Sequence, residues 1–416
     1  MKLDYKKTML IGLGFFTVSI VWGLYNVAVP LYLADLGLNG VTVGSIMTID
    51  NIFAIVFLPI FGALSDKTNT RYGRRMPYLL VGIPLSAISF MLIPVMRGKL
   101  VTLMITVIAM NFFMSIYRSP TVALMPDFTP KPLRSKANGV INFMGGIGAV
   151  LAFLIGGFLF NTSEFLPFAV GFGIMILTII IMYLLIHEPK EIEEDKTGKN
   201  DKAAEAGEHN GQKGRIMSLI FLLIAIFFWF TGYNAVETFF STYAGKVLNL
   251  GKNQASFLLA VFSAMLVVFS IPSGFIATKI GRKKTILAGI TILFGVFVTI
   301  NFIPKTNITP IYVLLAIGGI SWALININSY PMVVEMTSSR GVGKYTGYYY
   351  FFSMLAAIVS PILYGYIKDL LNSDSYLFIY SSISLVLAFF FMMLVKHGEA
   401  KPETKSAFEG IEHMGE

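Results

Sequence analysis

The sequence contains no cysteine, and this absence excludes disulfide bonds and thiolate metal sites. Histidine is scarce, and its four copies lie at the ends of apolar runs or in polar segments: His187, His209, His397 and His413. We therefore expect no metal, no cofactor and no buried histidine proton relay. Charged residues make up only 13% of the chain, which is about half the share found in soluble proteins.

Long apolar runs are abundant where charge is scarce. The 416 residues are 55% hydrophobic, with a mean hydropathy of +0.72, and runs of about 18 apolar residues or more recur along the chain. The first run is too long for a signal peptide and no cleavage site follows it, so we expect it to be retained. The pattern predicts an all-α integral membrane protein with twelve spans, at roughly 8–33, 41–65, 77–96, 100–125, 137–161, 165–187, 215–245, 253–278, 285–304, 309–335, 341–367 and 375–396.

The basic residues indicate how these spans are oriented. If the N-terminus is cytoplasmic, 25 of the 32 Lys and Arg residues fall in cytoplasmic segments, a bias that agrees with the positive-inside rule. The exceptions are Arg118 inside a span and, in the opposite loops, Arg97, Lys99, Lys246, Lys252, Lys305 and Lys368. The net charge of +9 is thereby explained without a nucleic-acid partner, and we expect a plasma-membrane protein with both termini in the cytoplasm.

A polar segment without Phe, Tyr or Trp separates the spans into two halves. It predicts a six-helix bundle at 1–187, a cytoplasmic linker at 188–214, a second six-helix bundle at 215–397 and a cytoplasmic tail at 398–416. Short motifs recur at matching spans: GALSD with RYGRR matches GFIAT with KIGRK, WGLYN matches WFTGYN, and SPTVALMPD matches YPMVVEM. Such a repeat predicts two bundles that rock about a central cavity, which is the architecture of alternating access.

The motif between the second and third spans carries a family resemblance. GxxxD…GRR, repeated between spans eight and nine, resembles the signature of the major facilitator superfamily. The longer form SDKTNTRYGRRMPY resembles the sucrose transporter group and, more distantly, the glycoside–pentoside–hexuronide cation symporters. PLYLADLGL (Pro30–Leu38), YRSPTVALMPD and PKPLRSKANG (Pro130–Gly139) are similar to segments of that group. The resemblance implies the major facilitator fold and a secondary transporter that imports a sugar, such as a disaccharide or glycoside, by cation symport.

The sequence differs from those symporters at one position that bears on the coupling ion. The melibiose-type symporters carry an Asp immediately before the Pro of the second span, within a cation site. Leu58 occupies this position here, before Pro59, and the nearest acidic residue is Asp50. We therefore expect protons rather than sodium ions to drive transport.

The charged loop after the second span is expected to form a cytoplasmic gate. The resemblance implies that ion pairs there hold the inner face closed until the halves rock. The alternative is that the cations are solvated and set the topology. We expect a mixed role, in which Lys67 and Arg75 mostly set the topology. The expected gate residues are Gly62, Asp66, Arg71, Gly73, Arg74, Asp127, Arg282 and Glu335, with a weaker second copy because Thr278 replaces its Asp.

Three ionisable side chains lie well inside the spans: Asp50, Arg118 and Glu237. Each costs about 2.5–3.5 kcal/mol to insert into a membrane, so each should face a cavity or a partner. We expect Asp50, with Glu237 as the alternative, to carry the proton, because burial favours the protonated form of a carboxyl group. Arg118 would sense the change or bind sugar. The competing interpretation is a fixed hydrogen bond between helices that never titrates.

Distances along the helices limit how these groups can pair. At 1.5 Å per residue, Asp50 and Arg118 differ in depth by roughly 10 Å. A direct ion pair between them therefore requires a tilted or broken helix, and a link through substrate or water is the alternative.

Amide and aromatic side chains of spans one, four, seven and ten are expected to bind the sugar, because these spans line the cavity in the superfamily that the chain resembles. Amides bond to hydroxyl groups, and aromatic rings cover the C–H face of a sugar. The alternative for the tryptophans is an interfacial belt or packing between helices. The expected substrate-binding residues are Trp22, Tyr25, Asn26, Asn51, Asn111, Arg118, Trp229, Tyr233, Asn234, Glu237, Trp322 and Asn326.

Other functions compete with sugar import. Export of amphipathic compounds is disfavoured because span five lacks the Gly-Pro-x-x-x-Gly pattern of proton-antiporting drug exporters. A non-transporting sensor or scaffold would need a signalling domain, and no tail here is long enough to be one. An enzyme is not expected, because no nucleophile–base pair is visible. We expect a monomer whose partners are a sugar, a proton and the lipid bilayer.

Overall fold

The computed structural model describes residues 4–129, 134–186, 188, 209–303, 308–336 and 342–398. Within these residues every regular element is helical. The predicted tail lies almost entirely outside them, as do most of the predicted linker and residues 130–133 of the loop after span four. The elements are α1 (Tyr5–Asp35), α2 (Gly40–Met47), α3 (Ile49–Lys67), α4 (Met76–Met96), α5 (Leu100–Phe128), α6 (Arg134–Leu159), α7 (Leu166–Leu185), α8 (His209–Lys246), α9 (Lys252–Ile280), α10 (Arg282–Ile300), α11 (Thr309–Val334), α12 (Val342–Leu371), the 3-10 helix η3 (Asp374–Tyr376) and α13 (Leu377–Leu394).

The described helices confirm the predicted all-α class with twelve spans. Twelve helical segments of the described chain are long and apolar enough to cross a membrane. Their outer surfaces carry large apolar side chains that are mostly exposed, such as Val101, Phe158, Phe275 and Leu370. A bundle that is apolar outside as well as inside is adapted to a lipid environment rather than to water.

The second span differs from the prediction because it consists of two helices. The Asn39 side chain caps α2 by accepting the Thr42 N–H at 2.9 Å. α2 ends at Met47, and the hydroxyl of Thr48 donates to the Ser45 carbonyl at 2.9 Å, a side-chain bond that competes with regular helix geometry. The break places Asp50 in the first turn of α3, where the positive end of a helix dipole favours a carboxylate.

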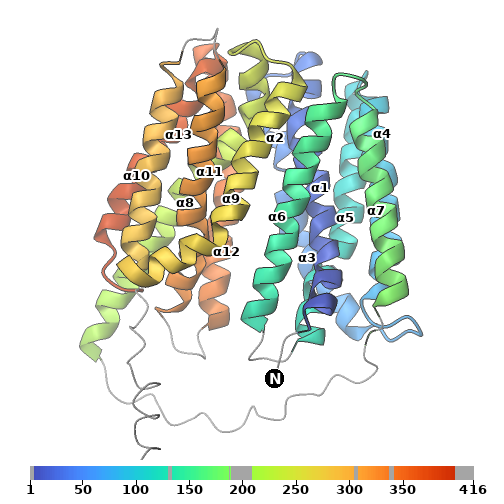
Figure 1. Cartoon of the computed structure of the whole chain (residues 1–416), viewed down its shortest axis with the longest axis horizontal. Coiled ribbons are helices and arrows are strands. Elements are labelled where there is room, and N and C mark those ends of the chain that lie inside the picture. Colours follow the sequence, from blue (N-terminus) through green and yellow to red (C-terminus); the bar gives the residue numbers. More distant parts are fainter. Residues whose placement is uncertain are drawn as a thin grey trace, which may run out of the picture.

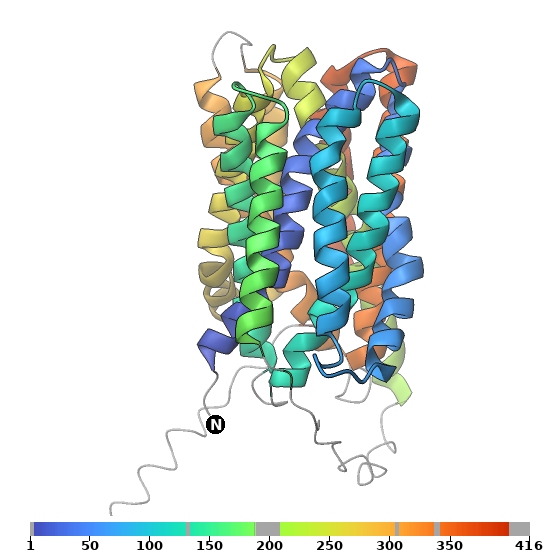
Figure 2. The same ribbon diagram turned by 90° about the vertical axis from the view of Figure 1, so that its right-hand side faces the viewer.

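The helices form two groups that lie side by side. Figure 1 shows α8 to α13 on one side and most of α1 to α7 on the other, with all long helices running between the same two faces (Figures 1 and 2). The main contacts between the groups join α6 to α9, α2 to α12 and α1 to α8. We call the face at which α1 begins the terminal face and the face at which it ends the distal face.

Candidate functional site

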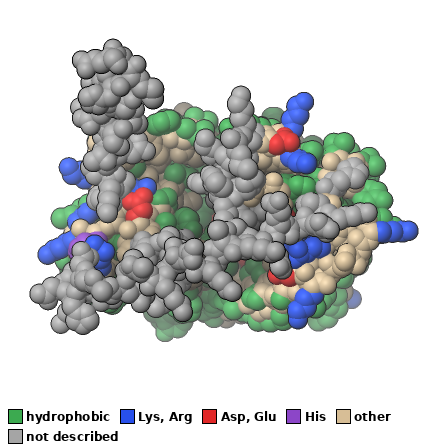
Figure 3. Space-filling view, turned by 90° about the horizontal axis from the view of Figure 1, so that it is seen from below, with side chains coloured by type: hydrophobic (Ala, Val, Ile, Leu, Met, Phe, Trp, Pro, Cys, Tyr) green, Lys and Arg blue, Asp and Glu red, His purple; other side chains and the backbone are tan. Residues whose placement is uncertain are grey.

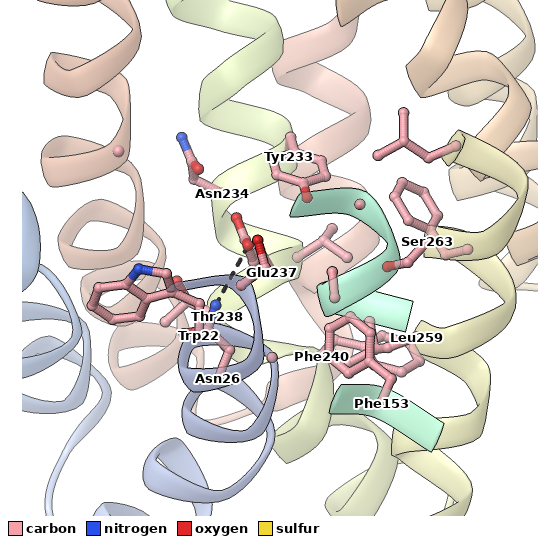
Figure 4. Close-up of a pocket in the computed structure, with 18 of the residues that line it drawn as sticks. Trp22, Asn26, Phe153, Tyr233, Asn234, Glu237, Thr238, Phe240, Leu259 and Ser263 are labelled. Atoms are coloured by element: carbon pink, nitrogen blue, oxygen red, sulfur yellow. Dashed lines mark hydrogen bonds between the residues drawn. The ribbon is translucent and has the colours of Figure 1, made fainter. Parts of the chain in front are cut away.

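A cavity of about 360 Å³ lies between the two groups of helices. Its lining comes from α1, α2, α3, α5 and α6 on one side and from α8 to α12 on the other. It is mixed in character, with amides and ionisable groups beside a wall of apolar and aromatic side chains (Figure 4). The lining includes Trp22, Asn26, Asp50, Asn51, Arg118, Phe153, Tyr233, Asn234, Glu237, Phe240, Phe262 and Ser263.

All three ionisable residues predicted inside the spans line this cavity. The Asp50 carboxylate accepts a hydrogen bond from the Asn51 side chain at 3.0 Å. Glu237 accepts one from the Asn26 amide at 3.4 Å, a contact that joins α8 to α1 (Figure 4). Asp50 is close enough to both Glu237 and Arg118 for electrostatic interaction. Among the described residues, however, Arg118 makes no ion pair within 4.0 Å, as the difference in depth led us to expect.

Aromatic rings and one unpaired amide complete the polar part of the cavity. Tyr233 lines it and stacks on Trp322, with 4.1 Å between ring centroids and 2° between planes. Trp22 also lines it and meets Tyr25 edge to face. The Nδ2 atom of Asn234 is buried without a hydrogen-bond partner in the described structure, so it is available as a donor to a ligand.

Five of the residues predicted to bind substrate do not line the cavity. Tyr25 and Trp322 lie behind the lining rings of Trp22 and Tyr233. The buried Asn111 amide bonds to the Val107 carbonyl at 2.9 Å, within its own helix. Trp229 is completely buried, and Asn326 lies outside the lining. Membership of a cavity-lining span does not reveal which way a side chain points, because only part of each helix surface faces the cavity.

The charged loop at the terminal face is organised around Arg75, a residue expected mostly to set the topology. Its side chain is 5% exposed, and its guanidinium binds Asp127 at 2.9 Å, Asp66 at 2.5 Å and the Ser65 hydroxyl at 2.5 Å. Arg74, which was expected in this role, reaches Asp66 from a more exposed position at 3.8 Å. The expectation that Arg75 mostly sets the topology was therefore wrong, because its buried side chain links the end of α3 to the end of α5.

The other predicted gate residues also act within one half. A Cβ on Gly62 would lie 2.8 Å from the Ser119 hydroxyl, so glycine permits the close approach of α3 to α5. Gly73 has a φ of 107°, a left-handed conformation that favours glycine. Arg71 bonds to the neighbouring Tyr72 hydroxyl, and Arg282 pairs with Glu335 in the second half.

Glu188 was predicted to begin the linker, yet it belongs to this loop. Its carboxylate accepts backbone N–H groups of Arg74, Arg75 and Met76 at 2.6–3.0 Å. It therefore caps the start of α4 and ties the end of the first half to the charged loop. A carboxylate after a span is common in sequences, so nothing in the pattern distinguished this one. Figure 3 views the terminal face, where Lys and Arg side chains lie mainly toward the rim.

The distal face holds contacts between the halves that the sequence analysis missed. Glu164, between α6 and α7, pairs with Lys252 of α9 at 2.6 Å and accepts the Tyr32 hydroxyl at 2.7 Å. Arg97 lies 3.3 Å from the same carboxylate. No ion pair between described residues joins the halves at the terminal face. Among the described residues, the ion pair that joins the halves therefore lies at the distal face.

The contact at Glu164 should be insensitive to pH near neutrality. Burial opposes ionisation, but hydrogen bonds from Lys252 and Tyr32 and the positive charges of Lys252 and Arg97 outweigh it and lower the pKa of Glu164. A lowered pKa stabilises the fold above the ordinary glutamate value of about 4.3, and this stability is lost as pH falls through the lowered pKa. We expect a difference in melting temperature between wild type and Glu164→Gln that is constant from about pH 6 to about pH 8 and shrinks only below the ordinary pKa. A midpoint near neutral pH would contradict this.

No described residues form a metal site, since no three His, Cys, Asp or Glu side chains in the described ranges gather closely enough. What the cavity offers instead is two carboxylates, one guanidinium, several amides, the polar aromatic rings of Trp22 and Tyr233, and a wall of phenylalanine rings. This set can bind a polar organic ligand through hydrogen bonds and can exchange protons with it or with water.

Comparison with known proteins identifies the family to which the chain belongs. The family model of the Major Facilitator Superfamily matches residues 11–253 and 222–413. The chain is 24% identical over 267 residues to the quinolone resistance protein NorA of Staphylococcus aureus, covering 64% of this chain and 66% of NorA. It is 21% identical over 325 residues to the class H tetracycline resistance protein of Pasteurella multocida, covering 75% and 76% of the two chains.

Solved structures show the same fold. The nucleoside transporter NupG matches with a TM-score of 0.73 at 15% identity over 94% of this chain and all (100%) of that chain. A D-xylose–proton symporter matches with a TM-score of 0.70 at 16% identity, covering 96% and 98% of the two chains. The narrower resemblance to the sucrose transporter group is not confirmed by these matches. Because the family model matches most of the chain and the helices form the same fold, this chain belongs to the Major Facilitator Superfamily and is a multi-pass membrane transport protein.

Proposed function

We propose that this protein is a secondary transporter that carries a small polyhydroxylated solute, a sugar or glycoside, together with a proton. The observation that carries the proposal is that Asp50 and Glu237, one from each half, face the same cavity beside Arg118. In the superfamily's architecture, a site between the halves is exposed alternately to the two sides of the membrane. A carboxyl group in such a site can take up a proton on one side and release it on the other.

The chemistry of the cavity suits a sugar. The amides of Asn26, Asn51 and Asn234 can donate to and accept from hydroxyl groups, and the rings of Trp22 and Tyr233 can cover a C–H face. The volume of about 360 Å³ lies at the small end of ligand cavities, which span about 300–1,000 Å³. A mono- or disaccharide is therefore a better match than a large amphipathic compound. We expect import in the cell, a single chain as the working unit and the plasma membrane as its location.

Export of small amphipathic compounds is the second candidate. It is favoured by the apolar wall formed by Phe153, Phe240 and Phe262 and by the resistance proteins among the relatives. The two candidates differ in what the amides do, because an amphipathic compound would leave several of them without partners, which costs free energy in a buried site.

Counterflow in proteoliposomes separates the two candidates. Vesicles containing the purified protein are loaded with sucrose, maltose, melibiose or trehalose and diluted into a trace of the same labelled sugar. Transient uptake of label with one of them supports the proposal. Saturable counterflow of a fluorescent amphipathic cation, with none for any sugar, would replace it with the second candidate.

A further inference from the structure

The carboxylate of Asp369, near the end of α12, binds the beginning of α2 in the other half. Its Oδ1 accepts the Gly40 N–H at 2.6 Å, and its Oδ2 accepts the Val41 N–H at 2.9 Å. These N–H groups belong to the first turn of α2 and have no partner within that helix. Carboxylates at such positions gain both the hydrogen bonds and the attraction of the helix dipole. Asp369 therefore caps a helix that is not its own.

The neighbouring cation does not compete for this carboxylate. Lys368 binds Asp374 at 2.7 Å, and Asp374 also lies 3.9 Å from Lys246. All three belong to the second half and pair among themselves. The bonds of Asp369 to α2 thus form a separate link across the boundary between the halves.

Close backbone packing accompanies the hydrogen bonds. A Cβ on Gly40 would lie 2.7 Å from the Gly365 carbonyl oxygen, and one on Gly44 would clash with the backbone of Pro361. α12 is the main neighbour of α2. The first half therefore contributes little to holding α2, and the contacts with α12 must break when the halves separate at the distal face.

The other end of α2 leads directly to the cavity. α2 has only eight residues and is separated from α3 at Thr48. A helix this short has little stability of its own, so its position depends on what it packs against. Met47, its last residue, and Asp50, two residues beyond Thr48, both line the cavity.

We propose that α2 is a gate at the distal face, that Asp369 is the latch that holds it closed, and that Thr48 is the hinge on which it moves. Closure places α2 against α12 and seals the cavity on that side. Opening requires the Gly40 and Val41 N–H groups to leave Asp369 for water. The link from this gate to proton uptake at Asp50 rests on the proposed function, but the gate itself does not.

The absence of native cysteine makes a direct test possible. Ser263 lines the cavity (Figure 4), so Ser263→Cys introduces a single thiol of nearly the same size. Its rate of reaction with a membrane-impermeant maleimide is measured in intact cells and in inside-out vesicles, without substrate. In the Asp369→Asn background we expect labelling from the distal side, measured in intact cells, to rise about tenfold. Labelling from the terminal side, measured in inside-out vesicles, should fall. About tenfold is the lower limit for losing a hydrogen bond to a charged group.

Two further variants keep the result interpretable. Asp35→Asn is the matched control, because Asp35 is an exposed acid at the same face, and it should leave both rates unchanged. Gly365→Ala opens the gate by another route, since its methyl group would meet the backbone of Gly40. Opposite changes in the two preparations also show that the variant is folded, because a misfolded protein would label faster from both sides.

Equal labelling rates in wild type, Asp369→Asn and Gly365→Ala would overturn the proposal. So would the same changes in Asp35→Asn, because they would reflect surface charge rather than the latch. The assay needs no substrate and no proton gradient. A failure to find a transported sugar would therefore leave the gate standing, and a failure of the gate would leave the transport proposal standing.

Discussion

Replacing Asp50 with Asn should abolish uphill accumulation of the transported sugar. Coupling to one proton at a membrane potential of 100 mV supplies about 2.3 kcal/mol, which permits roughly 50-fold accumulation. The amide side chain of the variant cannot release a proton, so the variant should only equilibrate the sugar, and accumulation disappears. Exchange of labelled for unlabelled sugar needs no net proton release and should decline much less. Both are measured with energised vesicles and with counterflow.

The control for this prediction is Asp35→Asn, which removes the same charge from an exposed position at the end of α1. It should accumulate sugar as wild type does. If Asp50→Asn still accumulates sugar to the full extent, Asp50 is not the proton carrier. The substitution Glu237→Gln, at the carboxylate that bonds to Asn26, then becomes the decisive variant.

Replacing Arg75 with Met should be the most destabilising change in the charged loop. It removes the partner of Asp127, whose side chain is only 14% exposed, and leaves that carboxylate buried without compensation. Breaking such a pair costs about 3 kcal/mol. The bond to Asp66 adds little, because that side chain is 58% exposed. Thermal unfolding of the purified protein in detergent measures the loss as a lower melting temperature.

Lys67→Met is the matched control, because Lys67 is an exposed cation at the end of α3. It should unfold at the wild-type temperature. The double variant Arg75→Met with Asp127→Asn should recover part of the loss, because it also removes the buried charge. Equal melting temperatures for Arg75→Met and Lys67→Met would show that Arg75 serves topology alone.

The fold was largely predictable because membrane insertion leaves few alternatives. Every backbone group within lipid must bond internally, so a run of apolar residues can only become a helix. Twelve runs therefore became twelve spans. The break at Thr48 was not predictable in this way, because α2 and α3 are both apolar and Thr hydroxyls make the same kind of bond inside unbroken helices, as Thr17 does in α1.

The sequence predicted site residues reliably only where burying the side chain in a membrane costs much free energy. Asp50, Arg118 and Glu237 are expensive inside a membrane, and all three line the cavity. Burying an amide against a helix backbone, or an aromatic ring against another ring, costs little free energy. The sequence therefore could not show that Asn26 and Tyr233 line the cavity while Asn111 and Trp229 do not. Glu164, Lys252 and Asp369 lie at helix ends, where charge is ordinary, and only the three-dimensional structure reveals that they join the halves.

The most direct test of the central claim is the external pH of de-energised cells that express the protein, recorded in weak buffer while sugars are added in turn. We expect alkalinisation on addition of one sugar, because each imported molecule removes a proton from the medium, and no such change in cells that express Asp50→Asn. If purified protein catalyses counterflow of a sugar that causes no pH change in this assay, transport is not proton-coupled and the role proposed for the two carboxylates is wrong.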